Sequence, residues 1–373
     1  MEEVSKTFVG LDVHKDSIVI GLAQPGREPG RVLGKIAHDI NKLLKLLAKV
    51  GPPERMLIVY EAGPTGYGLQ RALQAKGYQC DVIAPSQMPR RPGDRVKTDG
   101  RDCVQLAECS RAGQLRKVWV PDVEDEAIRD LARGREDAVN SRTKVRQQLK
   151  AFLLRHGVRY AGKTSWTKAY WRWLASLSFE VQASQTAFTE YWLAVQAAEE
   201  RVQRLTQALQ SSIGGWRFEP VVAALQVLRG VDVVSAIGLV AEIGDLRRFE
   251  HPRKLMGYLG LVPSEYSSGD RICRGSITKT GNTHARRLLT EAAWNYRFKA
   301  RIGRQAQRRQ EPLSELIRAT GWQAQLRLTT RFAALQKRGV QPNKACVAVA
   351  RELAGFVWNI ARLATQEQAS VRA

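Results

Sequence analysis

Short apolar runs alternate with amphipathic segments along the first 120 residues of this 373-residue chain. Two of the amphipathic segments, 39–51 and 66–77, have helical spacing, and the first is bounded by Asp39 and Gly51 as a capped helix is. Five runs rich in Val, Ile, Leu and Tyr have the length and residue types of β-strands: 7–14, 17–23, 30–37, 55–61 and 78–85. With a further helix near residue 99, the order β-β-β-α-β-α-β-α predicts a mixed sheet flanked by helices.

The rest of the chain has helical patterns. Residues 124–154 form a long, highly charged helical pattern, and residues 188–213 form a second long one. The two would pair either as an antiparallel coiled-coil arm, a common dimerisation device, or within an ordinary helical bundle. The segment GGWRFEP that follows breaks the helix and marks a boundary. We therefore expect an α/β domain at 1–120, a helical arm at 121–214 and a mainly α-helical domain at 215–373.

Charge narrows the class of partner. The 59 Lys and Arg residues outnumber the 36 Asp and Glu residues, which gives a formal charge of +23 and favours a polyanionic partner such as nucleic acid. A membrane surface is the rival, but no apolar run reaches transmembrane length and the N-terminus lacks a signal pattern. The five cysteines are widely spread without C-x-x-C spacing, which disfavours a disulfide framework or a zinc site. We expect a cytoplasmic protein with no membrane partner.

The positive charge is concentrated. Residues 271–310 contain eleven Lys and Arg side chains and one acid, Glu291. A solvated helix face explains most charge runs, but the scarcity of acids favours phosphate contact here. Upstream, Gly230 and Val231 stand in a turn that resembles a helix-hairpin-helix, although a structural turn is the simpler interpretation. The candidate nucleic-acid contacts of the basic segment are Arg271, Arg274, Lys279, Arg286 and Arg287.

Four carboxylates stand at the ends of elements in this basic chain: Asp12, Glu61, Asp99 and Asp102. Each alone has an ordinary explanation as a strand-end acid, a turn residue or a helix cap. Together they place acids on a first strand, a later strand and a following helix, which is the layout of ribonuclease-H-like nucleases. Oxygen ligands of this kind suit Mg²⁺, and such sites hold two ions about 4 Å apart for phosphodiester chemistry.

A second constellation lies downstream in YLGLVPSEYSSGDRICRGS. Ser264, Ser267 and Ser268 stand there with Tyr266 and Gly269, close to many basic residues. A serine that attacks phosphorus must lose its proton, and it needs positive charge nearby for the phosphorane oxygens. Taken alone, serines in a Gly-rich loop are more typical of turns.

Six motifs in order carry a family resemblance: VGLDVHK, YEAGPTG, KTDGRDC, LVAEIGDLRRF, YLGLVPSEYSSG and GSITKTGNTHARRLLTEAAW. Over almost its whole length the chain resembles the DEDD transposases of the bacterial insertion-sequence-110 family. The resemblance implies a ribonuclease-H-like (RuvC-like) N-terminal domain, a coiled coil and a C-terminal transposase domain. It also implies that Ser268 is the nucleophile, with Ser267 as the adjacent alternative, and that the metal-binding tetrad is Asp12, Glu61, Asp99 and Asp102.

The resemblance further implies DNA recombination through a covalent phosphoserine intermediate. Its partners would be double-stranded donor and target DNA, a structured guide RNA, and further protomers in dimers that assemble into a tetramer with composite active sites. The location would be the bacterial nucleoid. The third motif departs from the family pattern, because Gly100 loosens the expected helix start and Cys103 replaces the usual alanine.

Two other hypotheses stay open. One is a RuvC-like, Mg²⁺-dependent nuclease that uses only the carboxylates, with water as the nucleophile. The other is a nucleic-acid-binding protein without catalysis. A binding module has no need of four acids in a basic chain, and a simple nuclease has no need of the long C-terminal part.

Overall fold

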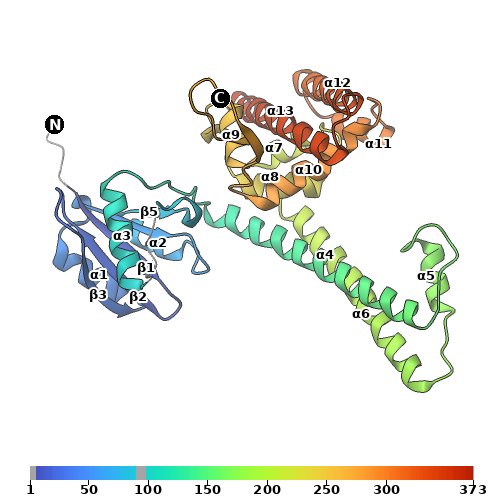
Figure 1. The fold of residues 1–373 in the computed structure, drawn as a ribbon, viewed down its shortest axis with the longest axis horizontal. Helices are drawn as coiled ribbons and strands as arrows, with labels where there is room; N and C mark the ends of the chain where they lie inside the picture. The colour runs from blue at the N-terminus through green and yellow to red at the C-terminus, as the bar shows by residue number, and fades with distance from the viewer. Residues whose placement is uncertain (1–5, 90–97, 373) are drawn as a thin grey trace. The chain divides into compact units, whose positions relative to one another are not determined.

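The computed structural model describes residues 6–89 and 98–372. The chain forms two units, Met1–Val120 and Pro121–Ala373, and each is described by itself (Figure 1). No helix among the described residues is long and apolar enough to cross a membrane.

A five-stranded mixed sheet forms the centre of the first unit. The strands are β1 (Thr7–Val13), β2 (Ser17–Ala23), β3 (Arg31–Ala37), β4 (Met56–Glu61) and β5 (Gln79–Ile83). They lie in the order β3-β2-β1-β4-β5, with β1, β2 and β3 antiparallel and with β4 and β5 parallel to β1. The expected strands and the mixed sheet are therefore confirmed.

Helices cover both faces of this sheet. The helices of this unit are α1 (Ile40–Val50), α2 (Gly68–Gln74) and α3 (Asp99–Arg111), with short 3₁₀ turns η1 (Pro53–Arg55) and η2 (Pro85–Gln87). The side chain of Asp39 caps α1 by accepting from the backbone N–H groups of Asn41 and Lys42, as the sequence predicts. Leu residues of α1 and α2 pack on the face that carries Val9 and Leu11, whereas α3 packs on the opposite face.

Two glycines bring α3 against the sheet. Gly10 and Gly21 are register partners on β1 and β2. A Cβ atom at Gly10 would lie 2.1 Å from the carbonyl oxygen of Cys103, and one at Gly21 would lie 2.5 Å from the same oxygen. Any larger residue would push the helix away. The glycine pair therefore sets the position of the α3 backbone.

In the second unit, two long helices run antiparallel. They are α4 (Val123–Arg155) and α6 (Gln182–Ser211), with the short α5 (Lys168–Ala175) between them in sequence. Arg135 donates to Thr206 while Arg146, further along α4, donates to Glu199, so residue numbers rise on one helix as they fall on the other. Aromatic residues close the end near α5, where Phe152 stacks on Phe188. The antiparallel pair is confirmed, and its role in dimerisation stays a prediction.

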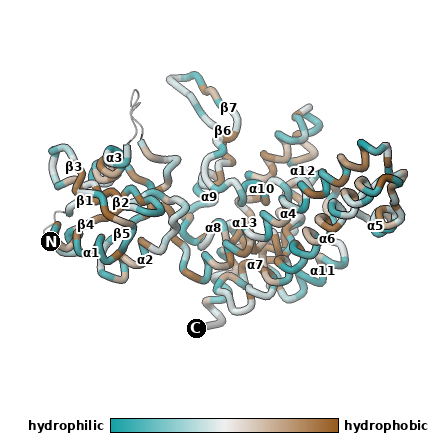
Figure 2. The backbone as a smooth tube through the Cα atoms, turned by 90° about the horizontal axis from the view of Figure 1, so that it is seen from below, coloured by the Kyte–Doolittle hydropathy of each residue, from teal (hydrophilic) through white to brown (hydrophobic). Residues whose placement is uncertain are grey.

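The C-terminal helices pack around α13 (Pro342–Arg372). The other elements are α7 (Glu219–Leu225), α8 (Val233–Ile243), η3 (Leu246–Arg248), α9 (Pro252–Tyr258), β6 (Pro263–Glu265), β7 (Arg274–Ile277), α10 (Thr283–Ala293), η4 (Trp294–Arg297), α11 (Arg304–Gln310) and α12 (Glu315–Lys337). Ala345, Val349 and Leu353 form a buried row on α13. Figure 2 shows hydrophobic residues gathered where α7, α8 and α13 meet.

The turn between α7 and α8 is built for packing. Gly230 has φ +81°, and a Cβ atom there would lie 2.5 Å from the Asn295 side-chain nitrogen and 2.7 Å from the Ala292 carbonyl oxygen. Glycine is needed because of both the backbone conformation and the close approach of the α10 end. These contacts support the simpler interpretation of this turn.

Candidate active site

The strand order brings Asp12 and Glu61 together. The two residues come directly after Leu11 and Tyr60, which are register partners on the parallel strands β1 and β4. Since side chains alternate along a strand, Asp12 and Glu61 face away from the core that holds Leu11 and Tyr60. Both therefore project toward the face that α3 covers.

The first turn of α3 adds the other two acids. Thr98 caps the helix by accepting from the backbone N–H of Arg101, Asp99 is the first helical residue, and Asp102 follows three positions later. Gly100 does not disrupt this start, and a Cβ atom there would lie 3.3 Å from Val32. Cys103 is fully buried, and its thiol donates to the Gly100 carbonyl at 3.2 Å. The carboxylates predicted from sequence thus come from β1, β4 and α3 to one end of one sheet.

A histidine that the sequence interpretation did not select completes this cluster. The His14 Nε2 atom lies 3.2 Å from Asp12 Oδ2 and 3.6 Å from Asp99 Oδ1. Asp12, His14 and Asp99 present ligand atoms within 4.8 Å of one another. The signal was the spacing Asp-x-His at the end of β1, which places both side chains on the same side.

The electrostatics of the cluster favour a cation. Burial raises the pKa of Asp12, and the Asp99 and Asp102 carboxylates raise it further, whereas His14 lowers it. Lys35 partly offsets the charge, with its Nζ 3.5 Å from Asp99 Oδ2. Carboxylate oxygens with one imidazole nitrogen are a donor set that divalent metal ions accept, so the residues present fit such an ion.

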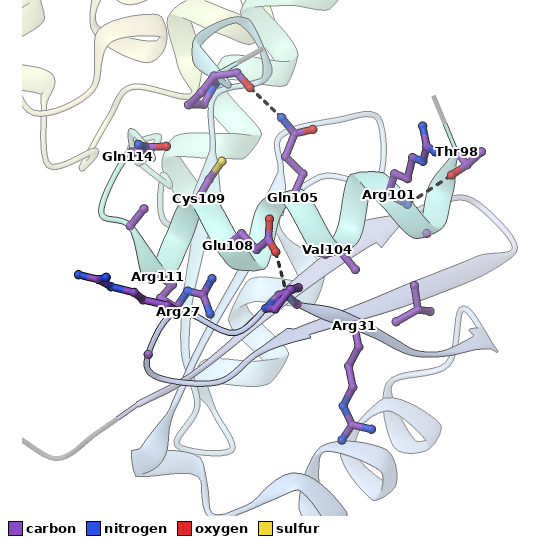
Figure 3. Close-up of a pocket in the computed structure, with 17 residues that line it drawn as sticks. Arg27, Arg31, Thr98, Arg101, Val104, Gln105, Glu108, Cys109, Arg111 and Gln114 are labelled. Carbon is purple, nitrogen blue, oxygen red and sulfur yellow. Dashed lines mark hydrogen bonds between the residues drawn. The ribbon is translucent and has the colours of Figure 1, made fainter. Parts of the chain in front are cut away.

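A groove runs along α3 in the first unit (Figure 3). Its volume is about 1330 Å³, and it extends from Thr98 to the turn between β2 and β3. Arg27 and Arg31 line it on the strand side, while Glu108 accepts from the backbone N–H of Gly30 at 2.8 Å. Arg27, Arg31, Arg101 and Arg111 make this groove basic, and none of the four candidate acids lines it.

The serine segment forms a hairpin in the second unit. Ser268 lies between β6 and β7, where its backbone exchanges two hydrogen bonds with Arg271, each 3.2 Å long. Its neighbour Ser267 is tied into the hairpin, since its hydroxyl donates to Glu265 at 2.8 Å and accepts from the Cys273 N–H at 3.3 Å. Ser268 is exposed, and no hydrogen bond from its hydroxyl is seen among the described residues. Its hydroxyl is therefore accessible to a substrate.

Arg286 holds the base of this hairpin. Its guanidinium group donates to the carbonyl oxygens of Leu259 at 2.9 Å and Thr280 at 2.8 Å, on either side of the two strands. A Cβ atom at Gly281 would lie 1.9 Å from the Tyr258 oxygen, so the chain passes very close here. These contacts fix the two ends of the segment that carries the serines.

The five basic residues expected to contact nucleic acid have different surroundings. Arg271, Arg274 and Lys279 are exposed, although Arg274 lies 3.5 Å from Glu265. Arg286 donates to backbone carbonyls at the base of the hairpin. Arg287 pairs with Glu136 of α4 and Glu291 of α10, each at 2.7 Å. Arg271 and Lys279 are thus available to a phosphate, whereas Arg274 would first have to leave Glu265.

A buried carboxylate joins three helices beside the hairpin. The Glu242 side chain on α8 is only 1% exposed, and it accepts from Arg133 of α4 at 2.6 and 2.9 Å. It also accepts from Asn282, the cap of α10, at 2.6 Å, and lies 3.6 Å from His284. Burial would raise the pKa of Glu242, but these three partners outweigh it and hold the pKa well below its usual range. Two of the sequence motifs contain Glu242, Asn282 and His284 without indicating that they meet, and Arg133 lies outside all six motifs.

Comparisons with known proteins identify the class of protein that carries these acidic and serine motifs. Residues 9–157 match a DEDD transposase domain, and residues 222–308 match the family described as Transposase IS116/IS110/IS902. The chain is an insertion-sequence transposase of the IS110 family, an enzyme that acts on DNA.

The similarity to known transposases extends over most of the chain. The putative transposase y4qE of Sinorhizobium fredii is 46% identical over 366 residues, which cover 97% of this chain and 90% of that protein. The transposase for insertion sequence element IS1533 of Leptospira borgpetersenii is 30% identical over 343 residues, or 89% of this chain and 97% of that protein. The alignments include both units, so the resemblance seen in the motifs is confirmed for the whole chain.

Proposed function

We propose that this transposase recombines DNA through a Mg²⁺-dependent site on a ribonuclease-H-like first unit and a serine nucleophile on the second. The observation that carries the proposal is that Asp12 of β1 and Asp99 of α3 meet beside His14, at the end of the sheet where Glu61 ends the neighbouring parallel strand β4. Antiparallel β1, β2 and β3 followed by parallel β4 and β5 support the ribonuclease-H-like fold. Asp12, Glu61, Asp99 and Asp102 would hold the metal, and His14 lies beside them. Bound Mg²⁺ supplies charge that stabilises the phosphoryl transition state.

The serine conserves the bond energy of the cut strand. The Ser268 oxygen forms a bond to phosphorus while the bond from phosphorus to one strand oxygen breaks, and the serine proton ends on the released strand hydroxyl. In the second step of the reaction, the hydroxyl group of a DNA strand attacks the phosphorus of the phosphoserine, the bond from serine to phosphorus breaks, and the proton returns to serine. The accessible Ser268 hydroxyl supports this role, whereas the Ser267 hydroxyl is already bonded to Glu265. Arg271 and Arg274 carry positive charge near the attacked phosphate.

Further partners follow from the same proposal. Double-stranded donor and target DNA would be paired by a structured guide RNA, and the +23 charge supports binding to polyanions of both kinds. Two cut sites require several protomers, so we propose dimers that join through the arm of α4 and α6 and assemble into a tetramer. Because the acids and the serine lie in different units of the chain, a composite active site is compatible with this assembly.

Covalent capture tests the serine. The unchanged chain, Ser268→Ala and Ser267→Ala are incubated with labelled element-end DNA, guide RNA and Mg²⁺, and the products are separated under denaturing conditions. We expect a protein–DNA adduct with the unchanged chain and with Ser267→Ala, and none with Ser268→Ala, while all three bind DNA equally. Adducts from Ser268→Ala, lost in Ser267→Ala, would assign the nucleophile to Ser267.

A nuclease that uses water is the second candidate. It is favoured by one observation, namely that all four acids lie within the first unit, which contains no part of the serine hairpin. In that case both serine variants would still cut DNA without any adduct, and Asp12→Asn would not cut.

A further inference from the structure

A second groove lies among the C-terminal helices, and its lining contains none of the catalytic or nucleic-acid-binding residues assigned above. Its volume is about 980 Å³, and its walls come from α9, the two strands of the hairpin, α12 and α13. Apolar side chains form a large part of its lining: Met256, Leu261, Pro263, Ile277 and Val347. An apolar surface in a strongly basic protein indicates a ligand with both apolar and anionic parts.

Cations surround this apolar surface. The groove is lined by Arg253, Arg327, Arg331, Lys344 and Arg351. Its one acid, Glu352, lies 2.8 Å from Arg327 and 3.3 Å from Arg331, and so partly neutralises those two residues. Arg253 and Lys344 are exposed, Arg351 is half-buried, and none of these three has a carboxylate partner within the described part of the chain. Three cations thus remain for an anion from outside.

This combination fits a single strand better than a duplex. An unpaired strand exposes the faces of its bases, which lie on apolar surfaces, while its phosphates reach cations at the edge. A duplex covers its base faces by stacking, so it would use the cations but not Met256, Ile277 or Val347. Both kinds of lining are satisfied only by unpaired nucleotides.

We propose that this groove holds an unpaired segment of the DNA strand next to the phosphate that the serine attacks. Gly275, Ser276 and Ile277 of β7 line the groove, and β7 leads directly from the loop that contains Ser268. A strand lying in the groove therefore continues toward that loop, which is the reason for choosing DNA over RNA. The inference rests on the proposed function, since strand exchange produces unpaired DNA beside the nucleophile.

Equilibrium binding tests the groove without any catalysis. The full-length chain is titrated with three labelled probes of one sequence: single-stranded DNA, single-stranded RNA and duplex DNA. The test variant is Lys344→Gln with Arg351→Gln. The matched control is Lys337→Gln with Arg338→Gln, which removes two exposed cations of the same region that do not line the groove. Ala348→Leu fills the groove without changing its charge.

We expect the test variant to bind single-stranded DNA at least tenfold more weakly than the control variant, with less than a twofold change for duplex DNA. The slope of log K against log salt concentration should become shallower by about 1.4, because each of the two lost phosphate contacts on a single strand contributes about 0.7 to that slope. Ala348→Leu should weaken the same probe at unchanged salt dependence. Equal losses for the test and control variants, or equal losses for duplex DNA or for RNA, would overturn the proposal.

The two proposals fail separately. If Ser268→Ala still forms adducts, the serine mechanism is wrong, but the affinity of the groove for single-stranded DNA is measured independently of it. If the groove variants bind single-stranded DNA normally while Ser268→Ala abolishes adducts, the groove proposal alone is wrong.

Discussion

Glu242 offers a sharp test of how the arm is joined to the C-terminal helices. Replacing it with Gln keeps the shape of the side chain but puts an amide N–H₂ group where a carboxylate oxygen accepts hydrogen bonds. Arg133 donates twice to this carboxylate and Asn282 once. The variant therefore faces one donor with another inside a buried site.

The expected loss follows from the burial of the two partners. Breaking a buried ion pair costs about 3–5 kcal/mol. Glu242 is 1% exposed but Arg133 is 51% exposed, so water screens one partner and the lower end of that range, about 3 kcal/mol, applies. For a unit of this size each kcal/mol lowers the melting temperature by about 2–4 °C, which predicts a decrease of about 6–12 °C.

Scanning calorimetry of the full-length chain measures this decrease in the transition of the second unit. The control is Glu291→Gln, which removes an α10 carboxylate that is 57% exposed and should cost less than about 1 kcal/mol. A decrease for Glu242→Gln no larger than for the control would refute the reasoning. The reasoning would also be refuted if Glu242→Gln and the double variant Glu242→Gln with Arg133→Gln both melted at the same temperature as the unchanged chain.

The pH dependence gives an independent check on the same residue. Folding lowers the pKa of Glu242 below its ordinary value of 4.5, so its stabilisation is complete above that pH and is lost as the pH falls below it. The difference in melting temperature between the unchanged chain and Glu242→Gln should therefore be constant between about pH 6 and 8 and shrink below about pH 4.5. A difference that grows on acidification would contradict the assignment.

Three further predictions concern other parts of the chain. Gly10→Val should displace α3 and lower the stability of the first unit by about 3 kcal/mol or more, because the new Cβ atom would meet the Cys103 carbonyl oxygen. Urea unfolding measures this loss, and Gly34→Val, at an open position, is the control. Asp125→Ala should destabilise the second unit by about 3 kcal/mol, since it leaves the buried Trp216 N–H without its acceptor and Arg217 with Asp122 as its remaining carboxylate partner; thermal melting would show this loss. His14→Ala should weaken binding of divalent metal by about tenfold without unfolding the first unit, whereas Lys15→Ala should not, as measured by calorimetric titration.

Local chemistry made much of the first unit predictable. Its strands are short and apolar, and Asp39 caps α1 by accepting hydrogen bonds from the backbone N–H groups two and three residues further on. The position of α3 against the sheet was not predictable in the same way. It depends on Gly10 and Gly21, which are eleven residues apart and meet only because β1 and β2 pair in one register. The periodicity of a segment shows which face is apolar but not which distant element will cover it.

Some residues of the candidate site could likewise be predicted from local sequence, and others could not. The acids could be selected because each stands near the end of a strand or the start of a helix that the sequence predicts. His14 was not selected, because the Asp-x-His spacing does not show that Asp99 of α3 lies beside it. Arg286 and Arg287 were grouped with the exposed basic residues because sequence shows charge but not the direction of a side chain. In the folded chain, Arg286 donates to backbone carbonyls and Arg287 pairs with two acids.

The strands, the long helices, the basic character of the protein and the four candidate acids could be predicted from the sequence, since these depend on residue type and spacing along the chain. The folded chain was needed to show that Asp12, His14 and Asp99 share one cluster, that Arg286 holds the base of the serine hairpin, and that Glu242 joins three helices. Each of these depends on contacts between residues far apart in sequence. Such contacts are set by strand register and by how closely helices approach, which no local pattern records.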